Sequence, residues 1–242
     1  MPLEPETRQK IQLFLALAVL LAAARTAYIL YERHADATQP AKAAPPLNPD
    51  YYVTPKKRYA YDLKSAKQLT QQPVWVKEGY RYPYFAYNPA THHASFDHPA
   101  GMLLPLQKLE IKDVVLDKAP DSGTMKQVMA IFEQDGQPYA FQVGTLDGAE
   151  YKIFSDGMLF IEDPHDLYKH WPPDIWNAIS RHQVKPGMSQ MQVTFSIGVG
   201  LAEGGAYNSA SPTLRYPNGG NSLLISYQDG KVTSIQSAQN PQ

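Results

Sequence analysis

The chain has 242 residues, enough for one large domain or two modest ones, and 43% of them are hydrophobic, enough for a packed core. The formal net charge of -1 argues against nucleic acid as a partner, because phosphate binding needs a local excess of Lys and Arg. The sequence contains no cysteine, which excludes disulfides, thiolate zinc sites, a thiol nucleophile and a lipid-modified N-terminal Cys.

Residues 11–31 form a long apolar stretch near the N-terminus. Only Gln12, Arg25 and Thr26 interrupt it, and its length is close to the ~20 residues with which a helix spans a membrane. We therefore expect residues 1–34 to be a membrane anchor that contacts lipid through residues 11–31.

The residues that flank this stretch suit a single membrane span. Tyr28 and Tyr31 fall where an aromatic belt meets the lipid headgroups, and Arg8 and Lys10 precede the span on the side that is usually cytoplasmic. This pattern predicts a single-pass protein of the bacterial inner membrane with its C-terminal bulk in the periplasm. The alternative is a cleaved signal peptide, since residues 22–24 are alanines of the kind found at cleavage sites.

The rest of the chain divides by composition into a spacer and folded parts. Residues 35–50 are rich in Pro and Ala without apolar periodicity, which is typical of a semi-rigid linker. We assign residues 35–70 to this linker and its lead-in, residues 71–165 to an all-β domain and residues 166–242 to a second domain of helices and strands. The expected fold class is therefore α+β, preceded by an N-terminal transmembrane helix.

Short β-type runs separated by turn residues fill the expected all-β domain. Asp135-Gly136, Asp147-Gly148 and Asp156-Gly157 supply the positive φ that tight hairpin turns require. They predict an antiparallel meander in a small barrel or a sandwich. The six predicted strands are residues 74–77, 109–116, 126–132, 139–145, 150–154 and 158–161.

The C-terminal region begins with two helical patterns. Asp174 is expected to cap a first helix that carries Ile175 and Ile179 on one apolar face. Ser189 and Gln192 match a capping box, which predicts the start of a second helix. Three strands are expected to follow, over residues 213–216, 222–227 and 231–235.

Three short motifs in this region carry a family resemblance: residues 187–193 (GMSQMQV) at a helix start, residues 196–198 (SIG) at its end and residues 229–232 (DGKV) at a turn. Together they resemble the SmpA/OmlA (BamE-like) family. The resemblance implies an αα-βββ fold in a bacterial envelope protein, with another envelope protein as its partner. Val199-Gly200 departs from the family's Gly-x-Pro ending, and the family's lipidated Cys is missing.

His92, His93, Asp97 and His98 form the densest polar cluster of the sequence. Imidazole and carboxylate groups ligate zinc or copper, so these residues are candidates for a metal site. Their spacing matches no recognised metal motif, and an exposed loop is the simpler interpretation. We therefore expect no cofactor.

Trp75, Tyr80, Tyr82 and Tyr84 belong to an aromatic segment. Exposed rings with polar tips make good platforms for glycan or peptide ligands, because they offer contact area at low entropy cost. The alternation of the three tyrosines also fits one face of an ordinary strand that packs against a core.

Residues 161–176 join the two expected domains. Without a nucleophile motif nearby, a hinge docked by Trp171 and Trp176 is a simpler interpretation than a catalytic group. The residues that could form an acid–base group are Glu162, Asp163, His165, Asp166 and His170.

These observations favour a non-enzymatic, membrane-anchored envelope protein that acts as a binding or assembly module. The first alternative is a module that binds cell-wall glycan or peptide through the Tyr-rich segment. The second is a metal-dependent envelope enzyme that uses the His cluster. The sequence carries no Walker A, G-x-G-x-x-G, G-x-S-x-G or EF-hand pattern.

Overall fold

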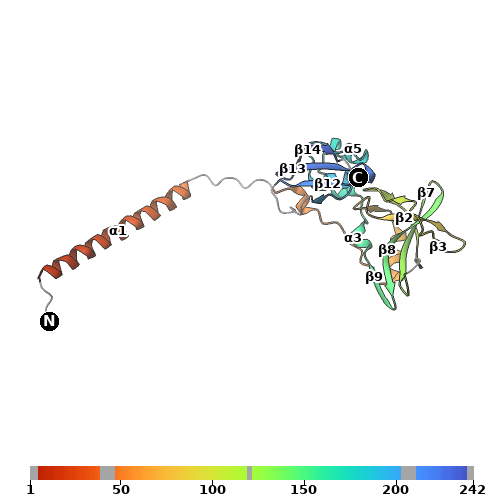
Figure 1. Cartoon of the computed structure of the whole chain (residues 1–242), viewed down its shortest axis with the longest axis horizontal. Helices are drawn as coiled ribbons and strands as arrows, with labels where there is room; N and C mark the ends of the chain where they lie inside the picture. Colours follow the sequence, from red (N-terminus) through yellow and green to blue (C-terminus); the bar gives the residue numbers. More distant parts are fainter. Residues whose placement is uncertain (1–4, 39–46, 119–121, 203–210, 239–242) are drawn as a thin grey trace. The chain divides into compact units, whose positions relative to one another are not determined.

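A computed structural model describes residues 5–38, 47–118, 122–202 and 211–238 of the chain (Figure 1). The structure is 31% helical and 33% strand by residue. Every pairing between the described strands is antiparallel. The expected mixture of helices and antiparallel sheets is therefore confirmed. The chain divides into two compact units, Met1–Asn48 and Pro49–Gln242.

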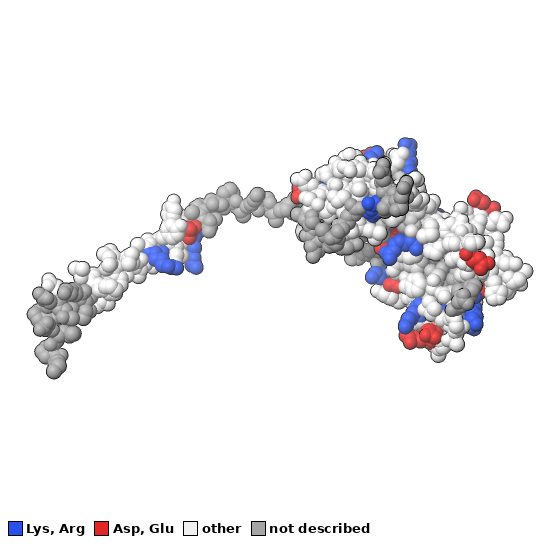
Figure 2. Space-filling model, in the orientation of Figure 1, with Lys and Arg blue, Asp and Glu red and all other residues white. Residues whose placement is uncertain are grey.

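The first unit is built on helix α1 (Pro5–Thr38). Its segment Gln12–His34 is exposed throughout and is long and apolar enough to cross a membrane or to serve as a signal sequence. The Thr26 hydroxyl donates to the Ala22 carbonyl at 2.9 Å. This polar side chain therefore has its hydrogen-bond partner within the helix. Figure 2 shows that the charged side chains of segment Gln12–His34 lie in its C-terminal part, after an uncharged stretch.

Helix α1 is longer than expected, since it continues through residues 35–38. These residues were assigned to the linker, and this part of the assignment is wrong. They are Ala, Asp, Ala and Thr, none of which breaks a helix as Gly or Pro does. Residues 39–46 of the predicted linker lie outside the described residues, and its last two residues open the 3₁₀ helix η1 (Pro49–Tyr52).

The largest sheet of the second unit has seven strands in the order β3-β2-β8-β7-β6, with β4 paired to β2 and β9 paired to β8. The predicted meander is confirmed for β6 to β9, and Asp135, Gly136 and Gly148 have the positive φ expected of its turns. The strands are β2 (Pro83–Asn88), β3 (His93–Ala94), β4 (Gly101–Met102), β6 (Ile111–Asp117), β7 (Lys126–Gln134), β8 (Gln137–Asp147) and β9 (Glu150–Ile153).

The third predicted turn, Asp156-Gly157, is wrong. It lies in the short helix α3 (Ser155–Met158), where the Gly157 N–H donates to the Phe154 carbonyl at 3.0 Å. The chain then leaves the meander, and β10 (Leu159–Phe160) pairs with β1 (Val74–Val76) instead. The strand β5 (Lys108–Leu109) completes this second sheet, in the order β10-β1-β5.

Strand β7 is buried on both faces, and two hydrophobic clusters lie on either side of it. One contains Val128, Ala130 and Phe132 and extends to the short helices α2 (Leu63–Ala66) and η2 (Lys67–Gln71). The other contains Met129 and Ile131 together with residues of β2, β3 and β8. This double burial explains the continuous apolar run in the β7 sequence.

The C-terminal helices are α4 (Pro164–Leu167), α5 (Pro173–Ser180) and α6 (Gln190–Ile197). The capping box of α6 is confirmed: the Ser189 hydroxyl accepts from the Gln192 N–H, and the Gln192 side chain accepts from the Ser189 N–H at 2.8 Å. Gly198 ends α6 with a φ of 87°. Asp174 is not the cap of α5, because Pro173 starts that helix and leaves Asp174 inside its first turn.

A four-stranded sheet follows in the order β11-β12-β13-β14. The three expected strands are confirmed, and β11 was not foreseen. Val193 and Ile197 of α6 pack in one buried cluster with Ile225 and Val232 of the sheet. The elements are β11 (Leu201–Ala202), β12 (Thr213–Tyr216), η4 (Asn218–Gly220), β13 (Leu223–Gln228) and β14 (Lys231–Ser237).

Two tyrosine hydroxyls meet inside this C-terminal core. Tyr216 and Tyr227 are both buried, and their hydroxyl oxygens lie 2.6 Å apart. Burial raises the pKa of Tyr216 to about 12 and also raises the pKa of Tyr227. The two buried hydroxyls therefore satisfy each other as hydrogen-bond partners.

Replacing Ile197 tests the packing of α6. Ile197→Asp places an unpaired carboxylate in the core between helix and sheet, which costs several kcal/mol. Ser189→Ala removes only a cap and costs about 1 kcal/mol. In thermal melts of the full-length protein, the melting temperature of Ile197→Asp should therefore be far lower than that of Ser189→Ala. Equal melting of the parent and Ile197→Asp would show that this helix face is exposed.

Because the pKa values of Tyr216 and Tyr227 are raised in the folded state, the free energy of unfolding should decrease at alkaline pH. The unfolded chain ionises tyrosine near pH 10, whereas folded Tyr216 resists ionisation up to about pH 12. The pair's contribution is complete below pH 10 and falls as the pH rises toward 12, by about 1 kcal/mol per pH unit for each tyrosine. Urea titrations at pH 9, 10 and 11 measure this loss, and the Tyr216→Phe/Tyr227→Phe double variant should lose less.

Candidate functional site

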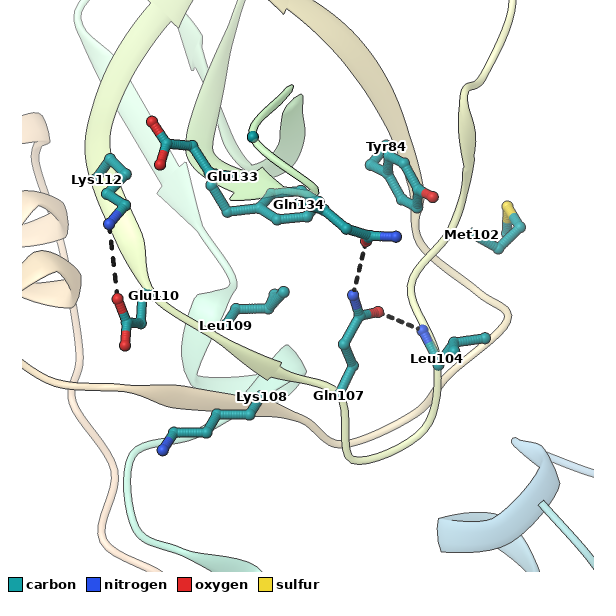
Figure 3. Close-up of a pocket in the computed structure, with 12 residues that line it drawn as sticks. Tyr84, Met102, Leu104, Gln107, Lys108, Leu109, Glu110, Lys112, Glu133 and Gln134 are labelled. Atoms are coloured by element: carbon teal, nitrogen blue, oxygen red, sulfur yellow. Dashed lines mark hydrogen bonds and ion pairs between the residues drawn. The ribbon is translucent and has the colours of Figure 1, made fainter. Parts of the chain in front are cut away.

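A pocket of 670 Å³ lies beside the ends of strands β5, β6 and β7 (Figure 3). Its volume is within the range of natural small-ligand sites. Apolar groups from three strands contribute to its wall, namely Tyr84 of β2, Leu109 of β5 and Phe132 of β7. The rings of Tyr84 and Phe132 meet edge to face, with their centroids 5.5 Å apart.

Polar side chains of both charges surround these apolar groups. Lys108, Glu110, Lys112 and Glu133 line the pocket, so its formal charges cancel. Lys112 and Glu110 form an ion pair at 3.6 Å, with 48% and 70% of their side chains exposed. Charges this solvated interact weakly, and the balance favours a ligand without net charge.

Two glutamine amides face each other in the pocket, as Figure 3 shows. Gln107 Nε2 donates to Gln134 Oε1 at 3.3 Å, and Gln107 Oε1 accepts from the Leu104 backbone N–H at 2.8 Å. The amide bridge is long and exposed, so a ligand can replace it without leaving a buried group unsatisfied. A primary amide offers donors and acceptors together, which suits ligands that carry hydroxyl or amide groups.

Residues 104–107 form a turn that positions Gln107. Its backbone N–H donates to the Leu104 carbonyl at 3.2 Å, with Pro105 second in the turn and Leu106 third. Leu106 has a φ of 52°, the left-handed value that a type II turn requires at this position and that a leucine rarely adopts. The surrounding structure holds this strain, because the Leu106 side chain packs against the C-terminal core.

Gly79 permits the close approach that holds this turn in place. A Cβ on Gly79 would lie 2.0 Å from the Pro105 nitrogen. On either side of this contact, the Tyr80 N–H donates to the Leu103 carbonyl at 2.7 Å and the Leu106 N–H donates to the Val76 carbonyl at 2.9 Å. Only a residue without a side chain fits between these two backbones.

Of the four aromatic residues proposed as a platform, Tyr84 lines this pocket and the others contact different regions. Trp75 packs against the C-terminal core. The Tyr80 ring lies against Gly219, where an added Cβ would be 2.9 Å from the ring atom Cε1. Tyr82 packs against the hydrophobic cluster that contains Val128 and Phe132, and it lines a smaller cavity of 290 Å³. Burial raises the pKa of Tyr80 and of Tyr82, as expected for rings engaged in packing.

The predicted metal ligands are not brought together. Over the described part of the chain, no three His, Asp or Glu side chains form a group that could hold a metal ion. His92 Nδ1 lies 3.4 Å from the Tyr87 hydroxyl, while His93 Nδ1 lies 2.7 Å from Asp117 Oδ1. The sequence pattern offered Asp97 as the nearby carboxylate, but the partner of His93 is 24 residues away.

Asp117 is a buried carboxylate that joins the two ends of the large sheet. Its side chain is 0% exposed, whereas that of His93 is 67% exposed. Besides His93, it accepts from the backbone N–H groups of Ala94 at 2.6 Å and Lys118 at 2.7 Å. Because β3 and β6 lie at opposite ends of the strand order, these contacts show that the sheet curls until its ends meet.

The acid–base candidates of residues 162–170 have structural partners. The Lys56 N–H donates to Glu162 Oε2 at 2.8 Å and lowers the pKa of that carboxyl, and Asp163 caps α4. His170 Nε2 and Trp171 Nε1 both contact Asp50 Oδ1, at 2.6 and 2.7 Å. Trp171 is thus buried as expected of a docking residue, but it docks the segment around Asp50 rather than the β-rich region.

The sequence carries no signal for most of the pocket. Gln134 stands beside the predicted Asp135-Gly136 turn, yet nothing links it to Gln107, which lies 27 residues earlier. The four charged residues are exposed, as charged residues usually are, so their types do not mark a site.

Comparisons with known proteins leave the chain without an assigned family. The sequence matches no protein-family model, and neither a curated protein nor a solved structure matches it. The resemblance to the SmpA/OmlA family therefore remains a prediction that rests on the motifs in the sequence.

Substituting Gly79 tests how the turn is held. Gly79→Ala forces the Gly79 and Pro105 backbones apart and should cost about 3 kcal/mol or more. Gly157→Ala is the matched control, because a Cβ there meets nothing within 4 Å and the residue lies in helix α3. Urea denaturation of the full-length protein should show a large loss for the first variant and little change for the second. Equal stability of both variants would contradict the close approach.

Proposed function

We propose that this chain is a membrane-anchored binding module of the bacterial cell envelope, and that its ligand occupies the pocket between Gln107 and Gln134. The observation that carries the proposal is the pocket itself: two facing amides and balanced charges around an aromatic and aliphatic wall. Sites for small polar ligands combine such apolar walls with a few orienting polar groups.

Binding, rather than catalysis, suits the environment of the charged groups. Catalytic carboxylates are usually held in desolvated surroundings that tune their protonation. Glu110 is 70% exposed and paired with Lys112, so water and a neighbouring cation already stabilise its charge. Such groups orient a ligand better than they transfer protons.

The apolar helix supports the proposed location. Segment Gln12–His34 supports a retained anchor in the inner membrane, because it extends past Arg25 to the tyrosines at its end. In this orientation the folded unit lies in the periplasm, where cell-wall polymers and other envelope proteins are the available ligands.

We also infer that residues 166–242 share the αα-βββ arrangement of the SmpA/OmlA family and contact another envelope protein. Support comes from the capping box at Ser189, the glycine end of α6 and the meander from β12 to β14 with its turn at Asp229-Gly230. This part of the proposal is independent of the ligand in the pocket.

Sedimentation with insoluble peptidoglycan tests the proposed site. The full-length protein in detergent should sediment with the polymer, and Gln134→Ala should weaken binding about threefold to tenfold, the value of one or two hydrogen bonds. Gln137→Ala is the matched control, since Gln137 is exposed on the same hairpin and does not line the pocket. Equal binding by the parent, Gln134→Ala and Gln137→Ala would remove the pocket from the proposal.

A further inference from the structure

The pocket described above is the first of three adjoining hollows. A second, of 220 Å³, shares Leu104 and Gln107 with it, and a third, of 500 Å³, shares His165, Trp176 and Ser180 with the second. We call each shared set of residues a ridge, because it borders two neighbouring hollows. All three hollows belong to the folded unit Pro49–Gln242.

The first ridge is the strained turn at residues 104–107. Leu104 and Gln107 stand together at one side of the first pocket in Figure 3. The Leu104 side chain is partly exposed, and Gln107 offers its amide beside it. A chain that crosses this ridge meets one apolar contact and one hydrogen-bonding group.

The second ridge is an aromatic stack. The His165 ring lies on the Trp176 ring with their centroids 4.1 Å apart and an interplanar angle of 26°. Asp163 Oδ1 lies 3.0 Å from His165 Nδ1, and Trp171 packs behind Trp176 at 5.2 Å. The indole is half-buried and held from two sides, so it offers a rigid edge to both hollows at little entropy cost.

From this arrangement we propose that the ligand is a neutral glycan strand, a polymer of N-acetylated sugars, that lies across the three hollows. This inference rests on the proposed binding function and names its ligand. Successive hollows divided by ridges match a chain of repeating bulky units better than a single small molecule.

The chemistry of each hollow supports a sugar. Sugar rings have apolar C–H faces that pack on aromatic rings such as Tyr84 in the first hollow, while Trp176 at the second ridge offers the edge of its ring as an apolar contact. Their hydroxyl and acetamido groups need both donors and acceptors, which Gln107, Gln134 and Asn177 supply.

Charge separates a neutral glycan from acidic ligands. The first hollow has two lysines and two glutamates, so it gives no net attraction to an anion. Among the described residues, no Lys, Arg, Asp or Glu lines the second hollow, and Lys169 is the one such residue that lines the third. The negative charges of an anionic polymer would be repelled by Glu110 and Glu133 of the first hollow.

Oligosaccharides of increasing length test the inference. Calorimetry on the full-length protein, in a detergent without a sugar headgroup, would use β-1,4-linked N-acetylglucosamine oligomers of two, four and six units. We expect affinity to rise at least tenfold from two to six units. A constant affinity would confine the ligand to one pocket and overturn the inference.

Variants in the first hollow and at the second ridge separate the contributions of the three hollows to binding. Gln134→Ala should weaken every oligomer, whereas Trp176→Ala should weaken the six-unit oligomer about tenfold and leave the two-unit oligomer nearly unchanged. Trp176→Phe keeps a ring and should restore most of the loss. If Trp176→Ala fails to fold, Ser180→Tyr decides, since Ser180 is exposed and its enlargement fills the border of the second and third hollows.

The outcomes distinguish this inference from the function on which it rests. Peptidoglycan binding that depends on Gln134, combined with binding of free stem peptides and no binding of the oligosaccharides, would overturn the glycan assignment and leave a binding module. Loss of any dependence on Gln134 would overturn both. Length-dependent binding that is lost in Ser180→Tyr or Trp176→Ala supports the groove.

Discussion

The backbone contact between Gly79 and Pro105 is the constraint on which the pocket depends. The turn at residues 104–107 lines both the first pocket and the hollow beside it, and it is held where Gly79 lacks a side chain. The same glycine is close to the end of α6, since a Cβ on Gly198 would lie 2.7 Å from the Gly79 carbonyl oxygen. Gly79 therefore lies between the turn at residues 104–107 and the end of α6, and a side chain there would displace the turn.

Local sequence signals predicted the parts of the fold whose causes are local. The hairpin turn at Asp135-Gly136 and the capping box at Ser189 each depend on a few neighbouring residues, and both are confirmed. Asp156-Gly157 shows the limit of such signals, because the same dipeptide also fits the first turn of a short helix. The strands β2, β3, β4 and β11 were not predicted, because β2 depends on pairing with the distant strand β8 and the other three have two residues each, too few to show an alternating pattern.

The candidate site was less predictable because tertiary contacts assemble it. Of the aromatic segment, Tyr84 reaches the pocket, while the positive φ of Tyr80 turns the chain before β2 begins. The sequence places His93 next to three other ligand candidates, yet folding gives it Asp117, from the opposite end of the curled sheet. Nearness along the chain misleads wherever a buried carboxylate organises distant strands.

The short strands at the sheet borders have a consequence for self-association. β3, β5, β10 and β11 each have two residues and stand at an end of a sheet, so they offer few backbone groups for pairing with another copy. The longer end strands are partly covered: η2 packs against β6 with a Lys67–Asp113 ion pair at 2.8 Å, and Ser189 bridges Lys231 on β14. The proposed anchor would confine copies of the chain to a plane at high local density, where pairing between sheet edges is a hazard. Short and covered end strands disfavour that pairing.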